Sequence, residues 1–228
     1  MTRVLGRHIC LALMVAVGLS SCGTDRDANS GTKIIKQTAT QLFTSRKKRR
    51  AAATPAPAIT RAALDKFHSP MMQIEVPTLG LTTFIVPFAQ NGDVETWSSV
   101  DDQTISFRQG IMIATRGFGS DLMQSIAPSA AQIASGAGTY DRAYYYLDGA
   151  DKTQRFDYRC TLANLGVEAI TVVDRQHSTL HVTESCSGKQ GDFVNEYWFE
   201  NGNFLRKSKQ LLVQPWAPIT FQRVIDNG

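Results

Sequence analysis

The sequence has little that would hold it inside a membrane. After residue 22 no run of 18 consecutive apolar residues occurs, whereas a helix that crosses a bilayer needs about 20. This excludes a helical membrane-spanning domain. Charged residues make up 19% of the chain and hydrophobic residues 43%, a balance that also excludes an entirely disordered chain. The composition predicts an ordinary globular domain with a proper core.

Histidine is scarce, with four in the whole chain. His177 and His181 are four residues apart in an alternating segment, which would place them on one face of a strand. Because no third ligand is visible nearby, we expect surface or half-buried histidines and no metal site. The paired carboxylates Asp101 and Asp102 are read as a solvated hairpin tip. We therefore predict no enzyme and no cofactor, while a polysaccharide hydrolase stays open.

Cysteine is equally rare, and only two of the four cysteines follow the N-terminal segment. Cys160 and Cys186 are predicted to form a disulfide, as is usual for two cysteines in an exported chain. Closing a loop of about 26 residues would stabilise the fold by roughly 3–4 kcal/mol. Buried free thiols are the alternative. Neither cysteine belongs to a CxxC pair, which argues against a metal site.

The N-terminus has the pattern of a bacterial lipoprotein signal. Arg3 and Arg7 precede an uncharged segment, residues 9–19, of a length that suits a signal peptide. The sequence Leu-Ser-Ser-Cys follows and ends at Cys22, whose thiol would take the lipid. An ordinary signal peptide with an incidental cysteine is the alternative. Gly23 follows where an Asp would indicate inner-membrane retention, so we expect lipid anchoring at the periplasmic face of the outer membrane.

Three regions follow from these features: residues 1–21 as the signal peptide, 22–58 as a lipidated tether with a short helix and a basic Ala/Pro linker, and 59–228 as a periplasmic β-rich domain. Arg3 and Arg7 leave with the signal, and the run 46–50 (RKKRR) carries five positive charges. The formal charge of +4 therefore becomes about −3 for the remainder. That balance excludes nucleic acid as a partner.

Short alternating segments rich in β-branched and aromatic residues dominate from Met71 onward. They predict eleven strands, at 71–76, 82–88, 93–98, 104–108, 111–116, 140–147, 153–160, 166–174, 178–186, 193–199 and 203–213. Asn201-Gly202 predicts a type I′ hairpin turn. Short helices are expected in 59–67, capped by Thr60, and within 119–135, capped by Asp121 and ending near Pro128. The predicted fold class is all-β: a curved antiparallel sheet, either a sandwich or a partly open barrel.

The segment 97–123 (WSSVDDQTISFRQGIMIATRGFGSDLM) resembles the YjbF/GfcB family of outer-membrane lipoproteins. The signal, the chain length, the segment ITRAAL and the Tyr-rich hairpin agree with this resemblance. It implies an all-β periplasmic domain that works beside polysaccharide export and secretion components, and it brings no catalytic role. Neither the RKKRR run nor the Cys160/Cys186 pair is a feature that we can assign to the family.

Five side chains are the candidates for contact with a ligand or a partner: Trp97, Arg116, Tyr144, Tyr145 and Tyr146. Aromatic rings could stack on sugar rings, although filling the core is the plainer role for each. We expect a non-enzymatic, outer-membrane-anchored lipoprotein in capsule or exopolysaccharide production or export, which binds polysaccharide or a secretion-system protein. The alternative is an acyl-chain or lipoprotein carrier similar to the outer-membrane Lol receptor, which would need a continuous apolar cavity inside the sheet.

Overall fold

The computed structural model describes residues 59–148, 150, 152–213 and 217–226. The predicted signal peptide, Cys22, the tether helix and the basic run therefore lie outside the described residues. Within the described ranges, no helix is long and apolar enough to cross a membrane.

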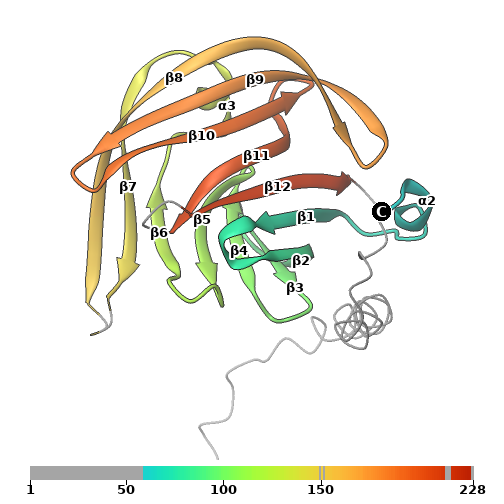
Figure 1. Ribbon diagram of the computed structural model, residues 1–228, viewed down its shortest axis with the longest axis horizontal. Helices are drawn as coiled ribbons and strands as arrows, with labels where there is room; N and C mark the ends of the chain where they lie inside the picture. The colour runs from blue at the N-terminus through green and yellow to red at the C-terminus, as the bar shows by residue number, and fades with distance from the viewer. Residues whose placement is uncertain (1–58, 149, 151, 214–216, 227–228) are drawn as a thin grey trace, which may run out of the picture.

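Twelve antiparallel strands form one sheet that curves into a nearly closed barrel (Figure 1). The strands are β1 (Met71–Val76), β2 (Leu81–Asn91), β3 (Val94–Ser99), β4 (Thr104–Arg108), β5 (Ile111–Arg116), β6 (Leu122–Ile126), β7 (Thr139–Leu147), β8 (Thr153–Val172), β9 (Arg175–Gly188), β10 (Gly191–Glu200), β11 (Phe204–Val213) and β12 (Ala217–Ile225). Three short helical segments accompany them, α2 (Arg61–Leu64), the 3-10 turn η1 (Pro77–Leu79) and α3 (Ala130–Ala134). The all-β prediction is confirmed, and the partly open barrel describes it better than the sandwich.

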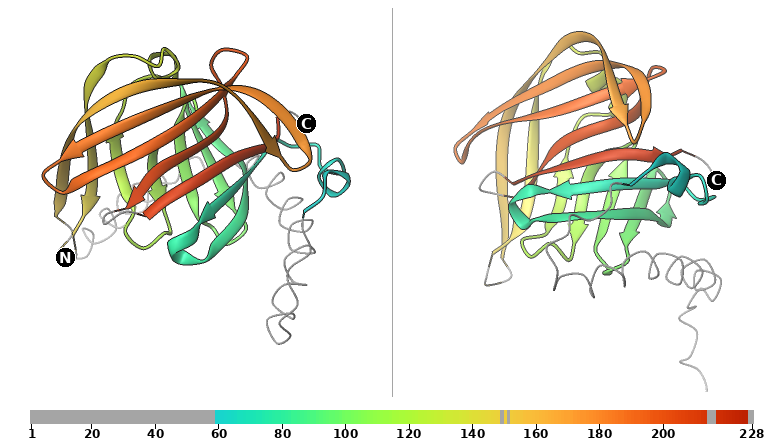
Figure 2. Two further views of the ribbon diagram at one scale, coloured as in Figure 1. Left: turned by 45° about the horizontal axis from the view of Figure 1, so that its top comes forward. Right: turned by 45° about the vertical axis from the view of Figure 1, so that its right-hand side comes forward.

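The strand order is β5-β4-β3-β2-β1-β12-β11-β10-β9-β8-β7-β6. Among the described strands, neighbours are thus consecutive in the chain except at β1 and β12, which pair and join the two ends of the domain. The sheet opens between β5 and β6 (Figures 1 and 2). There Arg116 Nη1 donates to the Leu122 carbonyl at 3.1 Å, and Leu122 N–H donates to Thr115 Oγ1 at 3.0 Å. Side chains therefore bridge the opening at one end.

The interior of the barrel is filled by side chains that alternate inward along the strands. Trp97, Phe107, Tyr144, Tyr197 and Phe199 are each at most 2% exposed. Rings meet edge to face, as Phe107 and Phe221 do at 5.0 Å between centroids. Close packing of this kind places the core inside the curve of the sheet.

Several local predictions are confirmed residue by residue. Thr60 caps α2, with its hydroxyl accepting from Ala63 N–H at 3.3 Å. Asn201 and Gly202 have φ of 49° and 90°, the left-handed values that the tight turn between β10 and β11 requires. Cys160 and Cys186 face each other on β8 and β9 and form the disulfide.

The prediction for 119–135 was wrong in its details. Asp121 does not cap a helix, because its carboxylate accepts from Gly117 N–H at 2.8 Å and Phe118 N–H at 3.0 Å and so closes the turn after β5. The next residues form β6, and the helix α3 begins only after Pro128. Its cap is Ser129, whose hydroxyl accepts from Gln132 N–H at 3.2 Å.

Two larger differences from the predicted strands concern β8 and β12. The expected strands 153–160 and 166–174 are one strand, β8, which continues through an irregularity between Asn164 and Gly166. Gly166 has φ of 93°, so the turn-like residues expected to separate two strands form a bulge in one. The last strand, β12, was not predicted, although it pairs with both β1 and β11.

Candidate functional site

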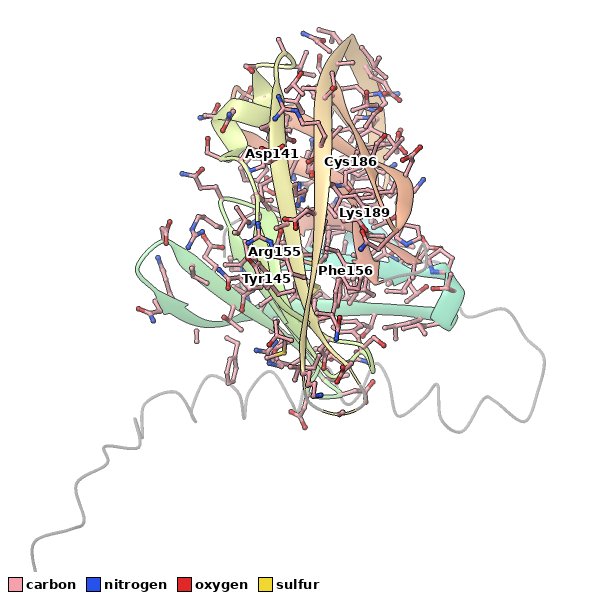
Figure 3. The ribbon with its side chains drawn as sticks, turned by 90° about the vertical axis from the view of Figure 1, so that its left-hand side faces the viewer. Asp141, Tyr145, Arg155, Phe156, Cys186 and Lys189 are labelled. Atoms are coloured by element: carbon pink, nitrogen blue, oxygen red, sulfur yellow. A yellow bond between two sulfur atoms is a disulfide. The ribbon has the colours of Figure 1, made fainter. Side chains whose placement is uncertain are left out.

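The five predicted contact residues do not meet in one place. Trp97, Tyr144 and Tyr146 lie in the interior, at 2%, 1% and 5% exposure. Tyr145 lies on the outer face of β7, with the Arg155 guanidinium 5.5 Å from its ring centroid (Figure 3). Arg116 is exposed at the end of β5, where it bridges toward β6. Their common role in binding therefore stays a prediction, and only the last two are at the surface.

A charged network lies in the middle of the interior. Arg142 and Glu184, 1% and 0% exposed, form an ion pair at 2.8 Å. The Glu184 carboxylate also accepts hydrogen bonds from the hydroxyls of Tyr140 at 2.6 Å and Tyr197 at 2.7 Å, and from Asn195 Nδ2 at 2.7 Å. Burial alone would raise the pKa of Glu184, but Arg142 and these donors hold the pKa below its usual value. The network is thus a buried charge pair in which the Glu184 carboxylate is fully engaged, while Arg142 Nε has no hydrogen-bond partner among the described residues.

This network does not offer a metal site in its present state. Cys160, Glu184 and Cys186 bring their ligand atoms within 4.8 Å of one another. The two sulfurs are bonded to each other, however, and the Glu184 oxygens are already engaged by four side chains. No thiolate is left to bind an ion.

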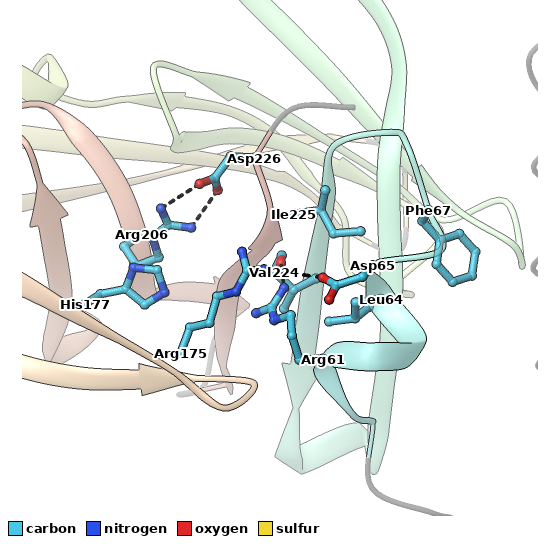
Figure 4. Close-up of a pocket in the computed structure, with 10 residues that line it drawn as sticks. All are labelled: Arg61, Leu64, Asp65, Phe67, Arg175, His177, Arg206, Val224, Ile225 and Asp226. Atoms are coloured by element: carbon cyan, nitrogen blue, oxygen red, sulfur yellow. Dashed lines mark hydrogen bonds and ion pairs between the residues drawn. The ribbon is translucent and has the colours of Figure 1, made fainter.

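A surface pocket of about 390 Å³ lies at the rim of the barrel, where α2 packs beside the end of β12 and the β8–β9 turn (Figure 4). Its volume is within the ~300–1,000 Å³ range of small-molecule sites. The residues that line it are Arg61, Leu64, Asp65, Phe67, Arg175, His177, Arg206, Val224, Ile225 and Asp226. We call this the rim pocket. It is the candidate functional site of the described domain.

Arg61 fixes one wall of the rim pocket. Its Nε donates to the Val173 carbonyl at 3.2 Å, Nη2 to Val172 at 3.2 Å and Nη1 to Val224 at 2.6 Å. One guanidinium therefore ties α2 to the β8–β9 turn and to the end of β12. Partial burial, followed by repulsion from Arg175, lowers the pKa of Arg61 below its ordinary value.

Arg206 occupies the opposite wall and is neutralised there. Its guanidinium bonds the Asp226 carboxylate through two nitrogens at 2.6 and 2.8 Å and the Glu200 carboxylate at 2.6 Å. Glu200 also contacts His177 at 3.0 Å. Burial would lower the pKa of Arg206, but Asp226 and Glu200 together raise it. On this wall the charged groups of Arg206, Asp226 and Glu200 are paired with one another.

Arg175 is the loosely held cation of the rim pocket. Its side chain is 58% exposed, and its contact with Asp65 is 3.4 Å long. Pairs of this kind contribute little, about 0–1 kcal/mol, because water screens them. The exposed guanidinium of Arg175 suits binding of an anionic group. The two carboxylates that line the pocket, Asp65 and Asp226, are paired with Arg175 and Arg206.

Sequence reasoning did not identify the rim pocket. Its residues come from α2, β9, β11 and β12, which only the pairing of β1 with β12 brings together. One signal was present in the sequence: Arg61 follows the Thr60 cap directly. A cation is unfavourable at a helix N-terminus, which indicates that this side chain is used elsewhere.

Together these features define a class: an all-β scaffold with a filled interior and a polar pocket at its rim. Residues 36–224 match the family model described as group 4 capsule polysaccharide lipoprotein gfcB, YjbF. The chain belongs to this YjbF family, as the resemblance in 97–123 implied.

One solved structure shares this fold. The hypothetical lipoprotein YmcC from Escherichia coli superposes with a TM-score of 0.66 at 13% identity, covering 82% of this chain and 96% of that one. A protein described as exported, with a YmcC-like fold, from Bacteroides fragilis gives a TM-score of 0.34 at 8% identity over 69% of this chain and 93% of its own. Among curated proteins, no sequence matches.

Proposed function

We propose that this protein is a non-enzymatic lipoprotein, anchored through Cys22 at the periplasmic face of the outer membrane, that acts in capsule or exopolysaccharide production or export. There its domain binds polysaccharide or a secretion protein. The family match over residues 36–224 carries this proposal, and the Leu-Ser-Ser-Cys pattern supports the anchor. The rim pocket, the half-buried Tyr145 and the exposed Arg116 are the surfaces that support a binding role.

The alternative, an acyl-chain carrier, is not favoured. Such a carrier needs a continuous apolar cavity, whereas the described interior is filled by aromatic side chains and holds a buried ion pair. A hydrolase is also not favoured: Asp101 and Asp102 are exposed in the β3–β4 turn, outside the rim pocket.

Deletion of the gene tests the role, and complementation tests the anchor. We expect the deletion to change the amount, chain length or secretion of surface polysaccharide, and the wild-type gene to restore it. Cys22→Ser should fail to restore it and should leave the protein soluble in the periplasm. Cys10→Ser, a matched change within the predicted signal segment, should complement fully. Unchanged polysaccharide in the deletion strain would contradict the role, and full function of Cys22→Ser would contradict the need for the anchor.

A further inference from the structure

Arg61 and Arg175 lie on one side of the rim pocket. Their charges are balanced differently from that of Arg206, the third arginine of the pocket. Arg206 has two carboxylate partners. Arg61 directs its donors at main-chain carbonyls, and among the described residues no ion pair within 4.0 Å joins it to a carboxylate. Among the described residues, Arg175 pairs with Asp65 at 3.4 Å. Asp65, Asp174 and Asp226 also act electrostatically on Arg61. What sets this side apart is that Arg61 has no close carboxylate partner and that Arg175 is loosely held.

The positions of these two side chains suit a bound anion. Arg61 is held from three directions, so its charge is fixed in place without a rotamer being lost on binding. Arg175 is more than half exposed and can turn its planar guanidinium toward a ligand, where a carboxylate accepts two parallel N–H bonds. Figure 4 shows both groups beside Asp65 at the pocket. A ligand anion would replace the long contact with Asp65.

The rest of the lining adds a small apolar part to a mostly polar pocket. Phe67 and Ile225 are half-buried and supply it, whereas Leu64 and Val224 are each 3% exposed and add almost none. The C–H faces of a sugar ring pack on such surface, while its hydroxyls stay in water at the open rim. A volume of about 390 Å³ holds more than a small inorganic anion needs.

We propose that the rim pocket binds the carboxylate of an acidic sugar residue within a polysaccharide chain, with Arg175 as the recognising cation and Arg61 as the fixed positive charge. This inference rests on the proposed function, because it takes polysaccharide as the ligand. It adds the chemical class of the sugar that is recognised and the place on the protein where that sugar binds.

The test measures binding of the full-length lipoprotein in detergent micelles to two probes. These are the polysaccharide exported by the producing strain and an oligosaccharide that contains glucuronic acid. Each is used in its native form and after reduction of its carboxyl groups to alcohols. We expect the native forms to bind about tenfold more tightly than the reduced forms, since a hydrogen bond to a charged carboxylate is stronger than one to an alcohol.

Variants place the effect at the pocket. Arg175→Gln should weaken binding of the native probes about tenfold and leave the reduced probes unaffected. Arg175→Lys keeps the charge but not the planar fork and should fall between. Arg159→Gln is the matched control, because Arg159 is 61% exposed on the outer face of β8 and pairs with Asp141. It should bind as the wild type does. Equal thermal unfolding temperatures would show that all three variants are folded.

Each other outcome overturns the inference in a distinguishable way. If native and reduced polysaccharide bind alike and Arg175→Gln changes neither, polysaccharide binding stands and the acidic-sugar site does not. Glycerol phosphate, the soluble headgroup of an anionic phospholipid, serves as a third probe. If it alone binds, with loss in Arg175→Gln, the site takes a lipid phosphate instead. If no probe binds, or if the exported polysaccharide has no acidic sugar, the acidic-sugar site is ruled out. The proposed function is then tested by the deletion phenotype alone.

Discussion

Replacement of Glu184 by glutamine is the sharpest test of how the interior is held together. The substitution keeps the shape of the side chain and removes one negative charge. Arg142 is 1% exposed and pairs with Glu184 alone among the described ion pairs, so its charge would be left buried without compensation. Breaking a buried pair in this way costs about 3–5 kcal/mol. That is a large part of the ~5–15 kcal/mol by which domains are stable.

Urea unfolding, followed by fluorescence and circular dichroism together, measures the effect. We expect Glu184→Gln to lower the free energy of unfolding by about 3–5 kcal/mol at neutral pH. The double variant Glu184→Gln/Arg142→Met should lose less than Glu184→Gln alone, because it leaves no charge inside. Asp141→Asn, next to Arg142 in sequence but 83% exposed, is the control and should change stability by at most ~0.5 kcal/mol.

The same pair predicts a pH dependence of known sign. The pKa of Glu184 is lowered in the folded state, against the opposing effect of burial, by Arg142 and the neighbouring donors. Its contribution to stability is therefore fully present above the unfolded glutamate pKa of about 4.3. It is lost as pH falls through the folded pKa. The stability gap between wild type and Glu184→Gln should close on acidification and stay constant from pH 6 to 8. A gap under ~1 kcal/mol at neutral pH would refute the reasoning.

Three further predictions concern the disulfide, a turn and the rim. Replacement of Cys160 and Cys186 together by alanine should lower stability by roughly 3–4 kcal/mol, seen in urea unfolding, and stability equal to the oxidised wild type would contradict this. Gly202→Ala should cost about 1–2 kcal/mol through its φ of 90° alone, because no atom lies within 4 Å of the added methyl group, and a neutral result would contradict that. Arg61→Gln should speed hydrogen exchange at the ends of β8 and β12 without changing exchange in β3 and β4, whereas uniform exchange would contradict the local tie.

Alternation along the strands was enough to predict most of the sheet. β1, β4 and β5 have the predicted bounds, because their apolar and polar residues alternate between clear turns. The segment 119–135 was misread because Asp121 can serve a turn as well as a helix cap, and only the contacts with Gly117 and Phe118 decide between them. β12 was missed because it follows a proline-containing segment and has another proline, Pro218, as its second residue.

The interior charge pair was visible in the sequence in one respect. In 178–186, Glu184 falls on the same face as Val182 and Cys186, and Arg142 shares a face with Tyr144. Period two therefore puts each charge on a face with residues that the structure buries. The rim pocket carried no such sign. Its residues are spread from 61 to 226, and local pattern cannot show that they come together.

The pairing of β1 with β12 has a consequence for how the domain assembles. Every other described strand pair joins neighbours along the chain, so those pairs can form as soon as their hairpin has been synthesised. β1, the first strand to emerge, waits for β12, the last, before the sheet closes. The rim pocket exists only after that final step, since it is built from α2 before β1 and from the end of β12. A ligand bound there would therefore hold the two ends of the domain together, and its binding energy would add to the stability of the closed sheet.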